Sequence, residues 1–134
     1  MSGERDLARL LAGMQPALRP GIWLFCRVAE PSAAELALAL ATFREDEGTT
    51  LVLAETEAAR LGLAGEFRCA WISLEIHSDL AAVGFLARVA TALAAAGIPS
   101  NAISAFHHDH LFVPYDERER ALALLEGLAA AASE

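Results

Sequence analysis

Residues 69–77 read CAWISLEIH, and this stretch decides the fold that the sequence predicts. Two sets of side chains alternate along it. The apolar set is Ala70, Ile72, Leu74 and Ile76, and the set between them is Trp71, Ser73, Glu75 and His77. A period of two places the two sets on opposite faces of an extended chain. The stretch therefore predicts a β-strand whose apolar face packs against a core.

A long helix is expected directly after this strand. Ser78 or Asp79 is placed to cap the helix at its start, and Gly97 is placed to end it. The apolar face of this helix is predicted to hold Val83, Leu86, Ala90 and Leu93.

A hairpin and a last helix follow. Residues 101–114, NAISAFHHDHLFVP, predict two strands around a tip at His108 and Asp109. Asp116, with Glu119 three residues further on, is a candidate capping box for the last helix. The order is then strand, helix, strand, strand, helix, which is a split βαβ pattern that lacks its last strand.

The first half of the chain repeats this order imperfectly. Ser32 and Glu35 form the capping box of a short helix there. The other expected elements are a helix over 5–14, a strand over 21–28, two strands within 42–53 and a short helix over 54–63. We therefore expect an α+β fold of two ferredoxin-like halves, residues 1–66 and 67–134. Each half has an antiparallel sheet with helices on one face.

Charge and composition exclude several partners. The net charge of −8 comes without a basic stripe, which argues against nucleic acid. The charged first residues predict no secretory signal, and no apolar run reaches membrane-spanning length. Cys26 and Cys69 lie in strand-like runs and are expected to be buried thiols of a cytoplasmic protein, with a disulfide as the alternative. A hydrophobic fraction of 55% favours self-association.

The hairpin tip carries the residues with the most chemistry, His107, His108, Asp109 and His110. Two imidazoles two positions apart, His108 and His110, are able to bind a zinc-type ion, with Asp109 or His77 as a further ligand. No cysteine cluster or HExxH motif accompanies them. The alternatives are a polar hairpin end whose side chains satisfy the backbone, and direct contact with a ligand or a partner.

Two further groups remain open. In the turn that contains TFREDEG, Arg44 could clamp a carboxylate, with Glu45 or Glu47 receiving an amino group, or the turn is simply exposed. The aromatic side chains of the strands are expected on the sheet face away from the helices, where they would pack against another half, another chain or a ligand. These are Trp23, Phe25, Trp71, Phe106 and Phe112.

Residues 74–98, LEIHSDLAAVGFLARVATALAAAGI, resemble the first strand, loop and helix of ACT domains. Gly84 stands where that family keeps a glycine at the helix entry. Residues 42–53 together with 101–114 resemble a small bacterial group of tandem ACT-like proteins and, more distantly, the ACT pairs of CASTOR-type sensors. Pro99 and Ser100 depart from the family pattern, because they delay the asparagine that usually follows the helix.

The resemblance implies a regulatory protein that binds a small molecule, such as an amino acid, through paired ACT domains. The strand missing from the second half must come from the first half or from a second chain. The ligand is expected at a junction of the helix-entry loop, Asn101 and the hairpin. The expected ligand-binding residues are His77, Ser78, Asp79, Val83, Gly84, Phe85, Asn101, His107, His108, Asp109 and His110.

The sequence thus predicts a cytoplasmic homodimer with a small-molecule ligand, no cofactor and no enzymatic activity. It has no nucleophile elbow, glycine-rich phosphate loop or nucleotide fingerprint. Two alternatives stay open. One is a ligand-free protein–protein interaction module, and the other is a metal-dependent enzyme that uses the cluster from His107 to His110.

Overall fold

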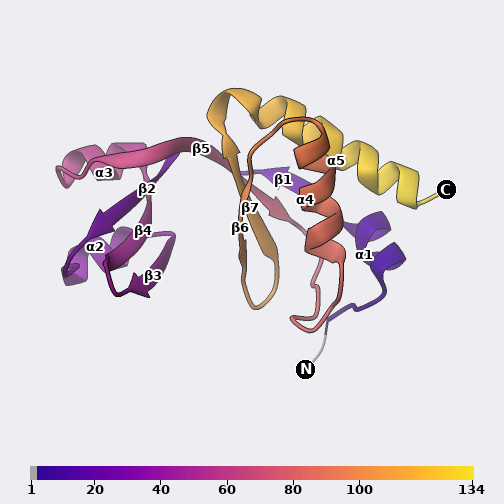
Figure 1. Cartoon of the computed structure of the whole chain (residues 1–134), viewed down its shortest axis with the longest axis horizontal. Helices are drawn as coiled ribbons and strands as arrows, with labels where there is room; N and C mark the ends of the chain where they lie inside the picture. Colours follow the sequence, from indigo (N-terminus) through magenta and orange to yellow (C-terminus); the bar gives the residue numbers. More distant parts are fainter. Residues whose placement is uncertain (1–2) are drawn as a thin grey trace. The chain divides into compact units, whose positions relative to one another are not determined.

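The computed structural model describes residues 3–134, which form two compact units (Figure 1). One unit comprises residues 20–69 and is called the 20–69 unit. The other, called the 70–134 unit, combines residues 70–134 with the N-terminal residues up to Arg19. The expected division into homologous halves at 66 and 67 stays a prediction.

The 20–69 unit has the complete ferredoxin-like order. Its elements are β2 (Trp23–Val28), α2 (Ala33–Leu38), β3 (Ala41–Glu45), β4 (Gly48–Ala54), α3 (Glu55–Arg60) and the first part of β5 (Gly65–Leu74). The strands lie in the order β3-β4-β2-β5, and each neighbouring pair is antiparallel. The predicted capping box of α2 is confirmed, because Ser32 accepts from the Glu35 N–H while the Glu35 carboxylate accepts from the Ser32 N–H.

The core of the 20–69 unit is small. Its core cluster consists of Cys26, Leu51, Leu53 and Ala58, and Val52 and Cys69 are buried as well. Helix α2 spans only six residues and buries none of them, so it covers little of the sheet. Both cysteines are buried free thiols, as expected. Burial raises the pKa of the Cys69 thiol to about 12, so this sulfur stays protonated at neutral pH.

The 70–134 unit completes its sheet with a strand from the N-terminal residues. Its elements are α1 (Leu7–Gly13), β1 (Pro16–Leu18), the second part of β5, α4 (Phe85–Ala95), β6 (Asn101–Ser104), β7 (Asp109–Pro114), the 3-10 turn η1 (Tyr115–Glu117) and α5 (Arg118–Ala132). β1 pairs antiparallel with β5, from Leu18 opposite Ile72 to Pro16 opposite Leu74. The missing strand is therefore β1.

The core of the 70–134 unit is formed by one sheet face and three helices. Ala70, Ile72 and Leu74 of β5 are fully buried there, as the alternation predicts. The helices contribute Leu10, Leu11, Phe85, Val89, Leu93, Ala121 and Leu125. The predicted fold class, an antiparallel sheet with helices on one face, is confirmed (Figure 1). Among residues 3–134, no helix is long and apolar enough to span a bilayer.

Two predicted helix starts are wrong. Helix α4 begins at Phe85 with Gly84 as its N-cap, six residues after Ser78, and Val83 lies outside it with 83% of its surface exposed. Helix α5 has Glu117 as its N-cap without a side-chain hydrogen bond, so the capping box of Asp116 is absent. The segment between Pro114 and α5 forms the 3-10 turn instead, and Arg118 binds the Tyr115 carbonyl and lies over its ring.

Candidate functional site

The loop of residues 77–84 and the β6–β7 turn come together in the 70–134 unit. The loop joins β5 to α4, and the turn joins two strands of the same sheet. The ring of His77 lies 5.2 Å from that of His107 and 6.4 Å from that of Phe106, measured between centroids. The structure thus brings two separately predicted segments side by side.

Asp109 is the centre of this meeting point. It was expected at the hairpin tip, but the turn consists of residues 105–108, closed by the Ala105 N–H bonding the His108 carbonyl. Asp109 is instead the first residue of β7 and is only 7% exposed. Its Oδ1 accepts from the Ser104 hydroxyl at 2.5 Å, and its Oδ2 accepts from the Ser78 hydroxyl at 3.4 Å.

The Asp109 carboxylate has no cationic partner among residues 3–134. Hydroxyl groups satisfy it in part, but a buried carboxylate is usually paired with a positive charge. A carboxylate oxygen offers two lone pairs, so the group retains acceptor capacity. Asp109 is therefore suited to receive an ammonium or another charged donor.

A crevice of about 70 Å³ opens beside Asp109. It is lined by Ser78, Asp79, Leu80, Ala82, Phe85, Leu86, Ser104 and Asp109. Pockets that enclose drug-sized ligands have volumes of about 300–1,000 Å³. The crevice in this form therefore admits a small group, and a larger ligand requires the loop to move.

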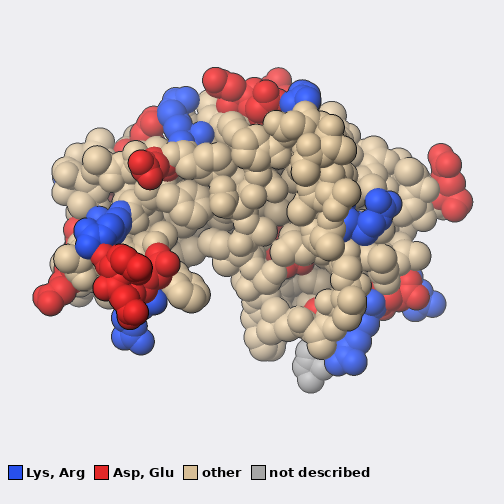
Figure 2. Space-filling view, viewed as in Figure 1, with Lys and Arg blue, Asp and Glu red and all other residues tan. Residues whose placement is uncertain are grey.

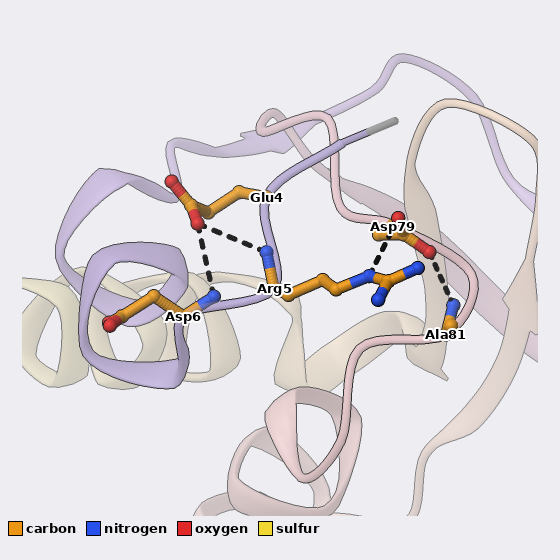
Figure 3. A network of polar contacts seen from close by, with 5 residues as sticks. All are labelled: Glu4, Arg5, Asp6, Asp79 and Ala81. Carbon is orange, nitrogen blue, oxygen red and sulfur yellow. Dashed lines mark hydrogen bonds and ion pairs between the residues drawn. The ribbon is translucent and has the colours of Figure 1, made fainter. Parts of the chain in front are cut away.

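An N-terminal strap, residues 3–6, holds the loop in place (Figure 3). The Glu4 N–H donates to the His77 carbonyl at 2.9 Å, and the Asp79 N–H donates to the Glu4 carbonyl at 3.0 Å. Gly3 lies against the loop so closely that an added Cβ would stand 2.6 Å from the Asp79 nitrogen. The strap thus behaves as a short parallel partner of the loop.

Asp79 joins the strap to the loop by its side chain. Its Oδ2 accepts from Arg5 Nε at 3.0 Å, and its Oδ1 accepts from the Ala81 N–H at 2.7 Å (Figure 3). The backbone hydrogen bond of Ala81, and then the bond from Arg5, hold the pKa of Asp79 below its usual value. Asp79 is thus occupied in shaping the loop.

Gly84 and Phe85 end the loop and start the helix. Gly84 has a φ of 91°, a conformation that strains any residue with a Cβ. Phe85 is buried in the core, whereas Leu80 and Val83 are exposed. The loop thus anchors itself through Phe85 and presents two apolar side chains outward.

His110 and Asn101 lie on the opposite sheet face from Asp109. Asn101 is paired with Phe112, and Ser104 with Asp109. Because paired residues share a face and neighbours alternate, Asn101 and His110 face away from the crevice. The structure therefore brings neither residue to the crevice, and His110 keeps a ring contact with His108, at 6.4 Å between centroids.

His110 makes its own contacts on that face. Its Nδ1 accepts from Trp71 Nε1 at 3.0 Å, and the Arg19 guanidinium stands 4.5 Å from the centroid of the Trp71 ring. Burial, and then the nearby charge of His108, lower the pKa of His110. Residues 3–134 contain no cluster of three side chains placed to hold a metal ion.

Sequence reasoning missed Ser104, Glu4 and Arg5. Ser104 is found once the register of the hairpin is known, because it is the direct partner of Asp109. No local signal identifies the strap, since Arg5 and Asp79 are 74 residues apart in the chain. Phe112, expected on an aromatic face, is buried there, whereas Phe106 is 63% exposed in the turn.

Comparisons with known proteins identify the family and the fold of this chain. One family model described as the ACT domain matches residues 2–70, and another of the same description matches residues 66–127. No curated protein matches the chain. A solved structure from Vibrio cholerae, described as a protein of unknown function and possible transport protein, is 41% identical. It has a TM-score of 0.83 over 96% of this chain and 99% of that one.

Two more distant structures share the fold. A protein from Agrobacterium tumefaciens is 18% identical with a TM-score of 0.69, over 87% of this chain and 89% of that one. The ligand-free regulatory subunit of aspartate kinase from Thermus thermophilus is 12% identical with a TM-score of 0.62, over 88% of this chain and 97% of that one.

Proposed function

We propose, from the premise that this chain belongs to the ACT domain family, that it is a cytoplasmic regulatory protein without enzymatic activity. ACT domains are typically ligand-binding regulatory modules. We propose further that the ligand is a small molecule with an ammonium group, such as an amino acid. It binds where the 77–84 loop meets the β6–β7 hairpin.

The observation that carries this proposal is the buried Asp109 carboxylate, which faces a crevice and has only hydroxyl partners among residues 3–134. An ammonium group would supply the missing charge and up to three donors. The exclusion of water from the crevice would strengthen this interaction.

The surroundings of the crevice support a link between binding and pairing with a second copy. Leu80, Val83 and Phe106 are 66%, 83% and 63% exposed, and all three belong to the loop or the turn. Exposed apolar side chains gathered at one place are typical of an interface. A ligand that moves the loop also moves these side chains, and it shifts the pairing to the extent that it favours one arrangement.

A thermal-shift screen of the common amino acids tests the proposal. A ligand at a hundred times its Kd stabilises the folded state by about 2.7 kcal/mol, which is a rise in Tm of roughly 5–10 °C. Asp109→Asn should abolish the rise, because the amide carries no charge. Asp116→Asn is the matched control, because Asp116 is exposed and does not line the crevice.

Two outcomes would contradict the proposal. One is a screen in which no amino acid raises Tm. The other is a rise in Tm that Asp109→Asn leaves intact. A silent screen together with a tight dimer in gel filtration would favour the ligand-free interaction module. The metal-dependent alternative has less support, because Nδ1 of His110 is occupied by the Trp71 indole.

A further inference from the structure

The 20–69 unit carries an open groove of about 690 Å³ at one end of its sheet. One part of its lining comes from residues 29–31, which follow β2, and from Leu36 of α2. The other part comes from Arg27 of β2 and from residues 42 and 44–49 around the β3–β4 turn. The groove stays open because α2 is short and buries none of its side chains. Its volume falls within the range of about 300–1,000 Å³ that is usual for ligand sites.

Arg27 and Arg44 line this groove with unused donors. Arg27 Nε donates to the Glu47 carbonyl at 2.6 Å, and its side chain lies over Gly48. The φ of 137° at Gly48 suits a glycine, and an added Cβ would stand 2.9 Å from Arg27 Nε. The two terminal nitrogens of Arg27, and all of the Arg44 guanidinium, bond none of residues 3–134.

Carboxylates line the same groove but leave both arginines unpaired. Glu30, Asp46 and the Glu47 side chain form no ion pair with any of residues 3–134, and Glu45 Oε1 accepts instead from the Thr50 hydroxyl at 3.0 Å. Figure 2 shows acidic and basic side chains gathered together over the β3 end of this unit. Elsewhere in the chain, arginines such as Arg60 and Arg68 are paired with neighbouring glutamates.

We propose that this groove binds a small carboxylate, which Arg44 holds and Arg27 assists. A guanidinium presents a planar pair of donors that match the two oxygens of a carboxylate. The acidic residues of the groove repel polyanions, so a ligand with several phosphates is disfavoured. They also suit a ligand that carries an ammonium group beside its carboxylate, because the Glu30 carboxylate would accept hydrogen bonds from that ammonium. The proposal is independent of the site at Asp109.

Isothermal titration with succinate, L-aspartate and inorganic phosphate tests this site. Either carboxylate should bind, and Arg44→Gln should weaken that binding about 10- to 100-fold, because a hydrogen bond to a charged group is lost. Arg44→Lys should retain part of the affinity. Arg88→Gln is the matched control, since Arg88 is exposed on α4 and does not line the groove. Tighter binding of L-aspartate than of succinate would support a role for Glu30.

The same titration separates the two sites. Asp109→Asn should leave binding at the groove unchanged, and amide NMR shifts should fall on residues 27–31 and 42–49. Three outcomes overturn the proposal: neither carboxylate binds, phosphate binds as tightly as they do, or Arg44→Gln binds as the wild type does. Because Arg44 is exposed at an edge strand, Arg44→Gln is expected to fold.

Discussion

The crevice of the 70–134 unit and the groove of the 20–69 unit occupy the same position in two ferredoxin-like arrangements. Each lies between the loop after the first strand and the turn of the following hairpin. The crevice encloses about 70 Å³ around a buried carboxylate, whereas the groove opens to about 690 Å³ beside two unpaired guanidinium groups.

This difference shows that the fold determines where a site lies, whereas the side chains at that place determine what it can bind. In the 70–134 unit, the loop is long, and the strap of residues 3–6 holds it against the hairpin. In the 20–69 unit, the Ser32 capping box starts α2 soon after β2 ends, and no such strap is present among residues 3–134. The length of the loop and the partner that covers it therefore decide whether the site is closed or open.

The largest expected effect concerns the two cores. Leu93→Ala removes a fully buried side chain from the large core of the 70–134 unit and should cost about 2–5 kcal/mol of unfolding free energy. Leu53→Ala removes an equally buried side chain from the small core of the 20–69 unit. We expect a cost near the lower end of that range, because a sparsely packed site collapses more readily.

Urea unfolding of both variants measures this difference. Hydrogen exchange in the wild type should show the same order, with the amides of β3 and β4 less protected than those of α4 and α5. Equal losses in the two variants, together with uniform protection, would contradict the view that the 20–69 unit is the less stable one.

A smaller, local effect is expected from removing the strap. A variant that lacks residues 2–5 loses the two backbone hydrogen bonds between Glu4 and the loop, at His77 and Asp79. The Asp79 amide should exchange about fivefold faster or more, because a hydrogen bond of about 1 kcal/mol or more is lost. The crevice would then resemble the open groove. Unchanged exchange at Asp79 would show that the loop holds its shape without the strap.

The smallest expected effect is a dependence of stability on pH. It should arise in the 70–134 unit, because all four histidines lie there. The pKa of His110 is lowered from 6.5, so the unfolded chain takes up this proton at a higher pH than the folded protein. The contribution of His110 to the free energy of unfolding is thus fully present above about pH 7. It falls as the pH drops from the unfolded pKa towards the lower folded pKa.

The charges that act on His110 come from His108, Asp109, Glu75 and Arg19. Protonation at Nδ1 would also break the hydrogen bond from Trp71. His110→Gln, which does not titrate, should reduce the loss of stability between about pH 7 and 5. Urea unfolding at several pH values checks this. A variant that loses as much stability as the wild type would rule out His110 as the source.

Much of the fold was predictable because local patterns carried it. The alternation from Ala70 to Leu74 and the capping box at Ser32 depend on neighbouring residues alone, and both are confirmed. The start of α4 was not predictable. Ser78 and Asp79 look like helix caps, but Asp79 is held by Glu4 and Arg5, and Gly84 delays the helix.

The site was predictable only in part. The meeting of the loop with the hairpin follows from the order of strands, and the structure places His77 beside His107. The sequence did not predict which side chains of the hairpin lie on which face of the sheet, because it placed the tip at His108 and Asp109. The turn actually comes before Asp109, which places Asp109 on the helix side and His110 on the other. One residue of register decides which side chains can meet.

The central claim is that Asp109 and the 77–84 loop form the ligand site. An amide NMR titration tests this claim directly. In it, spectra are recorded while an equimolar mixture of the common amino acids is added. We predict shifts at residues 77–85 and 104–109, and their loss in Asp109→Asn. A spectrum in which these residues stay unchanged at saturating amino acid, or in which Asp109→Asn shifts as the wild type does, would contradict the claim.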